Sequence, residues 1–305
     1  MIFNVLEKIL TQKIKLNTDD VSLYIRREDL IHPFVSGNKF RKLKYNLIQA
    51  KEEGLKTLLT FGGAFSNHIA ATAAAGKEHG FKTMGVIRGE ELADKVHGNP
   101  TLLFARQSGM ELVFVSREEY KLKSQNDLLN HLEQRFGPFY LLPEGGSNAL
   151  AVKGCEEILT PEDSDFDYIC VSVGTGGTIS GIMNSAMPSQ KILGFPALKG
   201  DFLKNEIRQF STKENMNLIT DYHFEGYGKI NADLIEFINT FYKQNNIPLD
   251  PVYTGKMMYG IFDLIAKDYF PKGTKILAIH TGGIQGIEGM NQKLKSKKLP
   301  LIYWQ

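Results

Sequence analysis

The sequence predicts an α/β protein whose sheets are mainly parallel. From about residue 55 to the end, short apolar runs rich in β-branched and aromatic residues alternate with segments of helical patterning. Several of these runs are almost continuously apolar, which is typical of strands buried on both faces. Several also end in glycine, and in open α/β sheets ligands bind beyond the carboxyl ends of the strands.

This alternation places the main strands and helices. The expected strands are 57–63, 83–89, 111–116, 139–146, 168–177, 191–198 and 275–283. The expected helices are 66–80, which begins with capping residues, 99–109, which begins with Asn-Pro, and 231–246, whose apolar residues have helical spacing. The polar stretch 160–167 is a candidate crossing between two α/β halves.

Composition places the chain among ordinary globular proteins. It has 305 residues, enough for one or two domains, with 42% apolar and 23% charged residues. A formal net charge of +2 argues against nucleic acid or an acidic membrane as the main partner. Cys155 and Cys170 form no CxxC pair and no cluster with His, so we expect two buried thiols, with neither a disulfide framework nor a metal site.

The N-terminal segment and the hydropathy pattern indicate a soluble, cytoplasmic protein. Residues 1–16 carry charges every few positions and lack an unbroken apolar core, which makes them a poor signal peptide. No run reaches the roughly 18 apolar residues that a membrane-spanning helix needs.

The strongest local motif is VSVGTGGTISG, in which an apolar strand runs into a glycine-rich turn and then into an expected helix. Gly174, Gly176 and Gly177 let the backbone approach a ligand closely, and free N–H groups at the helix start favour an anion. Thr175 and Thr178 add hydroxyl groups, so the expected ligand is a phosphate. The pattern is neither a Walker A loop nor a good dinucleotide fingerprint, and a plain strand–helix turn remains open.

Other segment ends carry polar residues at the same expected edge. Ser66 and Asn67 follow Gly-Gly at the start of a helix, where they either cap the helix or face a ligand. Thr281 follows the last expected strand and precedes another Gly-Gly pair. Tyr253 stands just before an expected helix and is either a ligand contact or a partly buried structural residue.

Basic residues are concentrated in RREDLIHPFVSGNKFRKLKYN, where six Lys or Arg occur within 21 residues. Lys39 directly follows Ser-Gly-Asn, which indicates a turn at the entry to a helix and not a solvated helix face. A phosphate-bearing aldehyde cofactor needs one lysine, a phosphate loop and few other charges. Because burial and nearby cations can lower the pKa of a lysine and make it nucleophilic, Lys39 is the candidate reactive residue.

Six short motifs occur in one order along the chain: GNKFRKLKY, GGAFSNH, PEGGSNAL, VGTGGT, DPVYTGK and HTGG. Together they resemble the 1-aminocyclopropane-1-carboxylate (ACC) deaminase / D-cysteine desulfhydrase family. The resemblance implies a pyridoxal 5'-phosphate (PLP) enzyme of the two-domain, tryptophan-synthase-β-like fold type II, with helices on both faces of parallel sheets. It also implies a homodimer that acts on a small amino acid.

The resemblance gives individual residues expected roles. Lys39 matches the lysine that forms a Schiff base with the cofactor and moves the substrate proton, and Lys42 matches a lysine that contacts the phosphate. Asn67 matches an asparagine that lies against the pyridine ring. Ser66 matches a serine beside the substrate carboxylate, and Tyr253 matches a tyrosine at the substrate.

The resemblance also covers the glycine loop and the last strand. Gly174 to Thr178 match the phosphate loop, and Thr281 matches the hydroxyl group that meets the pyridine nitrogen. A hydroxyl group there, in place of a carboxylate, leaves that nitrogen less fully protonated. That arrangement suits eliminations better than transaminations.

The implied reaction is a D-cysteine desulfhydrase-like β-elimination that releases ammonia and a 2-oxo acid. Phe65 stands where the family usually has Gln, and Ile69 and Ala70 stand near where it usually has Arg. The second tyrosine of ACC deaminases, sought before the last Gly-Gly, is replaced by the aliphatic run 277–279. The alternatives are ACC deaminase, a PLP- or ligand-binding protein without catalysis, and a nicotinamide oxidoreductase built on the glycine loop.

We expect two domains with PLP in the cleft between them. The larger, PLP-binding domain would comprise residues 1–40 and 153–305. The smaller α/β domain would comprise residues 41–152.

Overall fold

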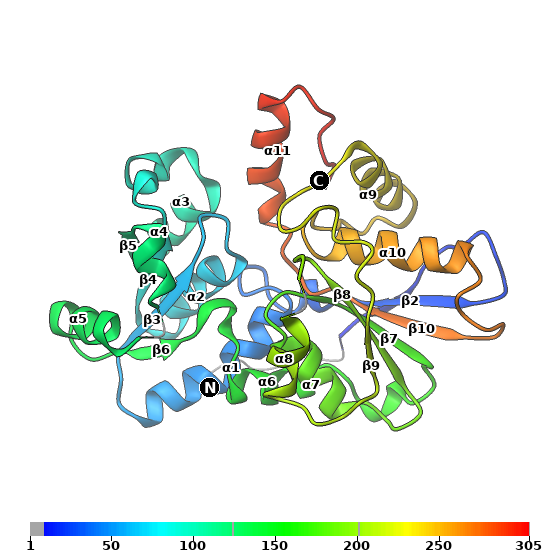
Figure 1. The fold of residues 1–305 in the computed structure, drawn as a ribbon, viewed down its shortest axis with the longest axis horizontal. Helices are drawn as coiled ribbons and strands as arrows, with labels where there is room; N and C mark the ends of the chain where they lie inside the picture. Colours follow the sequence, from blue (N-terminus) through cyan, green and yellow to red (C-terminus); the bar gives the residue numbers. More distant parts are fainter. Residues whose placement is uncertain (1–8, 124, 201, 305) are drawn as a thin grey trace.

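Two sheets form the centre of the molecule (Figure 1). A computed structural model describes residues 9–123, 125–200 and 202–304. The larger sheet has the strand order β1-β2-β10-β7-β8-β9, and the smaller sheet has the order β5-β4-β3-β6. Strands β1 and β2 pair antiparallel, and the other neighbouring strands pair parallel. The expected α/β class with mainly parallel sheets is confirmed.

The strands of the larger sheet are β1 (Thr11–Lys13), β2 (Ser22–Arg26), β10 (Lys275–Ile279), β7 (Tyr168–Val173), β8 (Lys191–Pro196) and β9 (Met216–Leu218). Those of the smaller sheet are β5 (Met110–Val115), β4 (Lys82–Arg88), β3 (Thr57–Gly62) and β6 (Tyr140–Leu142). Each apolar run contains its expected strand. The run 139–146 yields only the short β6, because Pro143 follows it and Gly145 and Gly146 adopt φ values of 69° and 68°.

The α-helices are α1 (Asn38–Glu52), α2 (Asn67–His79), α3 (Pro100–Gln107), α4 (Arg117–Lys121), α5 (Asn126–Phe136), α6 (Ala149–Glu156), α7 (Gly177–Ser185), α8 (Leu203–Arg208), α9 (Ala232–Asn245), α10 (Thr254–Ala266) and α11 (Gly286–Ser296). Short 3-10 turns are η1 (Glu28–Leu30), η2 (Glu90–Gly98), η3 (Glu144–Gly146) and η4 (Pro161–Asp163). The three expected helices are α2, α3 and α9, and the first two begin at the expected capping residues. Ser66, Asn99 and Asn231 accept a backbone N–H with their side chains at these three starts.

Helices cover both faces of the larger sheet. Ile169 and Val171 of β7 pack against Ile182 of α7 on one face. Tyr168 and Cys170, which alternate with them, belong to the core that α9 and α10 complete on the other face. All six residues of β7 are buried, which explains why this run has no polar alternation in the sequence.

The smaller sheet is also covered on both faces. Leu58 of β3 lies in a core with residues of α1 and α2, whereas its neighbour Leu59 lies in a core with residues of α4 and α5. Figure 1 shows this sheet with its helices on one side of the molecule and the larger sheet on the other, with α1 and α6 between them.

The expected domain boundaries fall inside α1 and α6, and these two helices pack against each other. A Cβ atom added to Gly154 of α6 would lie 1.9 Å from the carbonyl oxygen of Arg41 in α1, so this glycine permits the close approach. We propose to keep the division into residues 1–40 with 153–305 and residues 41–152, with α1 and α6 as the connection. The stretch 160–167 leads from α6 into β7 and so returns the chain to the larger sheet.

Two further expectations concern cysteines and membranes. Cys155 and Cys170 are buried free thiols, as expected. Within the described ranges, no helix is both long and apolar enough to cross a membrane. The first part of the segment assessed as a signal peptide, residues 1–8, lies outside the described residues.

Candidate active site

The residues singled out in the sequence meet in one cavity at the carboxyl ends of the strands. Its lining includes Lys39, Lys42, Ser66, Asn67, Gly174, Thr175, Gly176, Thr178, Tyr253 and Thr281. The smaller sheet contributes the residues that follow β3, and the larger sheet contributes those that follow β7 and β10. Gly177, the first residue of α7, does not line the cavity and is buried behind the loop.

A glycine turn places Lys39 at the start of α1, as the Ser-Gly-Asn sequence indicated. Gly37 is the residue before the helix and adopts a φ of 62°. A Cβ atom on Gly37 would lie 2.0 Å from the carbonyl oxygen of Thr281, which follows β10. The backbone N–H of Asn38 donates to that same oxygen at 3.2 Å. The start of α1 is therefore fixed directly against the end of β10, and only glycine fits there.

Lys39 and Lys42, the lysine pair, converge on one backbone carbonyl. Their Nζ atoms donate to the oxygen of Gly145 at 3.2 and 3.0 Å, and Lys42 also donates to Ser147 Oγ at 2.9 Å. Burial and the nearby Lys42 hold the pKa of Lys39 well below its usual value. Burial also lowers the pKa of Lys42 to about 8. The lowered pKa favours the uncharged amine form of Lys39, which is the form that can act as a nucleophile.

The other basic side chains of the Lys39 segment have carboxylate partners. Arg26 pairs with Asp163, Arg27 with Asp29, Arg41 with Glu28, and Lys44 with Glu157. In the described part of the chain, neither member of the lysine pair has such a partner. The concentration of charge in this segment thus has two causes, structural ion pairs and a pair of cavity lysines that an anionic ligand would neutralise.

The glycine loop after β7 forms the wall beside the lysine pair. Thr175 Oγ1 lies 2.6 Å from Ser147 Oγ, and Asn38 Nδ2 donates to Thr178 Oγ1 at 2.8 Å. Gly176 adopts a φ of 81°, which turns the chain into α7. Loop N–H groups, two hydroxyl groups and Lys42 together form a donor set suited to a phosphate.

Thr281 pairs with a hydroxyl group that the sequence reasoning missed. Its Oγ1 lies 3.1 Å from Ser172 Oγ at the end of β7, and both residues line the cavity. The two strands are neighbours in the larger sheet, which explains why residues 109 positions apart meet. Among the described residues that line the cavity, none is Asp or Glu.

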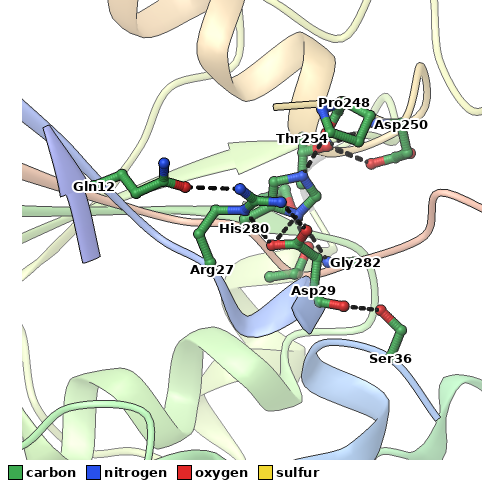
Figure 2. A network of polar contacts seen from close by, with 11 residues as sticks. Gln12, Arg27, Asp29, Ser36, Pro248, Asp250, Thr254, His280 and Gly282 are labelled. Atoms are coloured by element: carbon green, nitrogen blue, oxygen red, sulfur yellow. Dashed lines mark hydrogen bonds and ion pairs between the residues drawn. The ribbon is translucent and has the colours of Figure 1, made fainter. Parts of the chain in front are cut away.

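Figure 2 shows how the turn that carries Thr281 is held. The N–H of Gly282 donates to His280 Nδ1 at 3.2 Å, so the ring carries its proton on Nε2, which donates to the carbonyl of Pro248 at 2.7 Å. Asp29 Oδ1 lies 3.6 Å from His280 Nδ1, and the Asp29 carboxylate accepts two N–H groups of Arg27. The hydrogen bonds of His280 to Gly282 and to Pro248, which lies in the segment before α10, therefore fix the Thr281 turn.

Tyr253 enters the cavity because Asp250 shapes the chain ahead of α10. The Asp250 carboxylate accepts the backbone N–H groups of Val252, Tyr253 and Thr254 at 2.7–2.9 Å. The Tyr253 ring packs edge-on against Tyr227, with ring centroids 6.0 Å apart and a hydrogen bond between the side chains. Burial, followed by Tyr227, holds the pKa of Tyr253 well above its usual value.

Tyr227 is therefore a second tyrosine in the cavity, and the sequence reasoning did not single it out. The run 277–279, where a second tyrosine was sought, is buried strand β10. The only sequence signal was a tyrosine between glycines in EGYGK. Lys256 of α10 donates to the carbonyls of His223 and Gly226 at 2.9 and 2.8 Å and so holds the loop that carries Tyr227.

His68 is a further cavity residue that the sequence did not single out. It is 1% exposed, and neither ring nitrogen has a hydrogen-bond partner. Burial, with Lys39 and Lys42 nearby, holds the pKa of His68 well below its usual value, so the ring is neutral. A buried side chain without partners that lines a cavity indicates a missing ligand.

Ser66 and Asn67 lie at the N-terminus of α2, so capping and a place in the cavity are both observed. Ser66 Oγ accepts the N–H of Ile69 and also lines the cavity. Asn67 Oδ1 accepts from Gln285 Nε2 at 2.9 Å, which joins the smaller sheet's helix to the segment before α11. Ile69 and Ala70, by contrast, are buried and do not line the cavity.

The donor set fits PLP. The lysine pair without a carboxylate partner, the phosphate-type loop, the hydroxyl pair of Ser172 and Thr281, and the unpartnered His68 occur in one cavity. These groups offer an amine for an aldehyde, donors for a phosphate and polar atoms for a ring.

Comparisons with known proteins agree with this geometry. A putative ACC deaminase of Pyrococcus horikoshii is 32% identical over 90% of this chain and 88% of its own length. A bifunctional D-cysteine desulfhydrase/ACC deaminase of Arabidopsis thaliana, described as mitochondrial, is 33% identical over 87% of this chain and 73% of its own. The solved structure of an ACC deaminase homologue has a TM-score of 0.82 and 28% identity, covering 97% of this chain and 95% of that one.

The family comparison covers both sheets and the whole cavity. Residues 8–282 match the family described as "Pyridoxal-phosphate dependent enzyme". The match includes the Lys39 turn, the glycine loop and Thr281, and the likeness in structure extends over nearly the full chain. With its two helix-covered parallel sheets and its lysine cavity, the chain belongs to the PLP-dependent enzymes and has the tryptophan-synthase-β-like, type II fold of that family.

Proposed function

We propose that this enzyme catalyses a D-cysteine desulfhydrase-like β-elimination on a small amino acid and releases ammonia and a 2-oxo acid. The observation that carries the proposal is the lysine pair, which shares a cavity with the Ser172–Thr281 hydroxyl pair and with no acidic lining residue among those described. The plant relative, which is named for D-cysteine desulfhydrase and ACC deaminase activities, supports it.

Each residue of the cavity has a proposed task. PLP, when bound, supplies an aldehyde that condenses with amines and a ring that draws electrons from the substrate α-carbon. Lys39 would bind the aldehyde and, once displaced by substrate, would take the α-proton as a base, since its depressed pKa favours the uncharged amine. Lys42 and the loop from Gly174 to Thr178 hold the phosphate, which favours the charged form of Lys42.

The remaining groups orient the reactants. Thr281, held by Ser172, offers a hydroxyl group to the ring nitrogen, which a hydroxyl protonates less fully than a carboxylate would. Asn67 lies against the ring, Ser66 meets the substrate carboxylate, and Tyr253 lies at the substrate. These assignments follow the family resemblance, and the common cavity supports them.

The elimination balances without an oxidant. Lys39 takes the α-proton of cysteine, the Cβ–S bond breaks, and sulfur leaves with the bonding pair. With one water, cysteine then gives hydrogen sulfide, pyruvate and ammonia.

ACC deamination is the second candidate, because of one specific observation. ACC has no α-proton, so ring opening needs additional polar groups at the substrate, and the hydrogen-bonded Tyr227–Tyr253 pair supplies two hydroxyl groups there. Membership of the PLP family does not support a nicotinamide oxidoreductase or a protein without catalysis.

The test combines absorption with product analysis. We expect the wild type with PLP to show a visible absorption band that Lys39→Ala lacks, and D-cysteine to yield pyruvate. Lys39→Ala should lower turnover at least roughly 10³-fold, within the range that a positioned base contributes. If ACC yields 2-oxobutanoate and D-cysteine yields no pyruvate, the second candidate replaces the first. Absence of a Lys39-dependent band would exclude both.

We further propose that the enzyme is a homodimer and acts in the cytoplasm. The resemblance supports the dimer, and two buried free thiols suit a reducing compartment. Sedimentation velocity and cell fractionation would test the two statements.

A further inference from the structure

A second cavity lies next to the active site and is not explained by a substrate as small as cysteine. Its volume is about 250 Å³, and it shares Asn67, Tyr227 and Tyr253 with the cavity that holds the lysine pair. The two cavities are therefore adjacent, with these three side chains at their common border.

The walls of this cavity are mainly apolar and come from both halves of the molecule. Phe65, from the loop before α2, lies on one side, and Met290 of α11 lies on another. Pro251 and Val252 of the segment before α10 line it as well. Phe65 is 49% exposed, so its ring is open to solvent on one part of its surface.

The Phe65 ring has a defined seat on α11. A Cβ atom added to Gly289 would lie 2.6 Å from Phe65 Cε1, so the ring rests directly on the helix backbone at this glycine. Any larger residue at position 289 would displace the ring. The position of the Phe65 ring, and with it the space left in the cavity, therefore depends on glycine at position 289.

The polar groups of the cavity do not offer a partner for a charged substituent at its centre. The Asp250 carboxylate is fully occupied by backbone N–H groups and by Thr254 Oγ1. Lys293 is an exposed residue on the last part of α11, at the rim. Inside the cavity, burial of apolar surface is the main favourable contribution that a ligand could gain.

We propose that the preferred substrate is a β-thio-substituted amino acid whose sulfur carries an apolar group, such as an S-alkyl or S-benzyl cysteine, and that this group occupies the cavity between Phe65 and Met290. This inference rests on the proposed β-elimination. Lys39 takes the α-proton, the Cβ–S bond breaks, and the thiolate leaves with the bonding pair and takes a proton. With one water, the products are the thiol, pyruvate and ammonia.

The test uses the full-length, PLP-loaded enzyme and both enantiomers of cysteine, S-methyl-, S-propyl- and S-benzyl-cysteine. Pyruvate formation gives kcat/KM. We expect an increase of about fourfold for each added methylene group, the factor that corresponds to burial of one CH₂. A flat or falling series, with cysteine still turned over, would overturn this inference and leave the proposed function intact.

A binding measurement gives a readout other than turnover. Alanine, norvaline and phenylalanine lack a β leaving group, and their dissociation constants follow from the change in the visible band. We expect phenylalanine of the preferred hand to bind at least roughly tenfold more tightly than alanine. Equal affinities would contradict the inference, and absence of the Lys39-dependent band would remove the proposed function together with it.

Two variants and one charged substrate test whether Phe65 causes the preference for an apolar group on sulfur. Phe65→Gln should lower the ratio of S-benzyl-cysteine to cysteine activity about tenfold or more. The matched control is Phe34→Gln, because Phe34 is 59% exposed and packs on Phe104 away from the cavity. It should leave the ratio unchanged, and an equal fall in both variants would count against the inference. If the enzyme prefers S-carboxymethyl-cysteine to S-propyl-cysteine, Lys293 selects the substrate through its charge. That result would overturn the proposal that the cavity binds an apolar group.

Discussion

Two regions of the active-site cavity are held in different ways. We call the turns that carry Lys39 and Thr281 the floor, and Phe65 with the loop that carries Tyr227 the mouth. On the floor, the turn of Lys39 and the turn of Thr281 lie so close that Gly37 has no room for a Cβ atom. At the mouth, Phe65 is half exposed, and the loop that carries Tyr227 includes Phe224 and Glu225 at positive φ. The floor is fixed by backbone contacts between the turn before α1 and the turn after β10, whereas the mouth depends on single side chains.

The residues proposed to carry out the reaction and those proposed to select the substrate lie in different regions. The groups proposed to move a proton and hold a phosphate lie on the floor, where displacement of about 1 Å can cost 10²-fold in rate. The groups that would choose the substrate lie at the mouth, which includes Phe65. Variants of the floor should therefore affect folding and cofactor binding, and variants of the mouth should mainly affect substrate affinity.

The largest expected effect comes from Gly37→Ala. The new Cβ atom would meet the Thr281 carbonyl at 2.0 Å, and the residue would keep a left-handed φ, so we expect a loss of roughly 3–5 kcal/mol of unfolding free energy. Urea unfolding measures it. The control is Gly54→Ala, which has a φ of 71° but no neighbour within 4 Å and should lose only about 1 kcal/mol. Similar losses in the two variants would contradict the tight contact on the floor.

The next effect is a pH dependence of stability in the protein without cofactor. The pKa of Lys42 is about 8 in the folded protein and about 10.4 when unfolded, so the unfolded state binds more protons between these values. Stability should therefore rise from pH 8 to pH 10, by on the order of 3 kcal/mol at most for this residue. Urea unfolding of wild type and Lys42→Met at both pH values tests this. Equal rises in both proteins would show that Lys42 is not the cause.

A smaller effect is expected at the mouth from Lys256→Met. The variant removes both hydrogen bonds to the loop of Tyr227 and leaves the carbonyls of His223 and Gly226 without this donor, at a cost of about 1–3 kcal/mol. KM for the amino acid should rise more than the dissociation constant of PLP. Lys267→Met is the control, because Lys267 pairs with Asp263 on the surface, where ion pairs contribute little to stability. If the dissociation constant of PLP rises more than KM, Lys256 supports cofactor binding and not substrate binding.

The sequence by itself determined the main strands, three capped helices and the residues of the floor. The runs that became β3, β4, β5, β7, β8 and β10 are apolar because their strands are covered on both faces, and this burial is visible in composition alone. Lys39, the glycine loop and Thr281 stood out because close backbone contacts require glycine next to them. Short edge strands β1 and β9 gave no such signal, since three residues define no period.

Only the tertiary structure decided which side chains face one another across the chain. His68 and Ser172 are ordinary residues of a helix and a strand until the cavity brings them beside the lysine pair and Thr281. Tyr227 reaches Tyr253 because Lys256 holds its loop through backbone carbonyls, which leave no mark in a sequence. The spacing of apolar residues and the positions of glycines indicate local burial and local backbone geometry. Contacts between distant side chains depend on strand order and on loop positions, and a local sequence pattern does not contain this information.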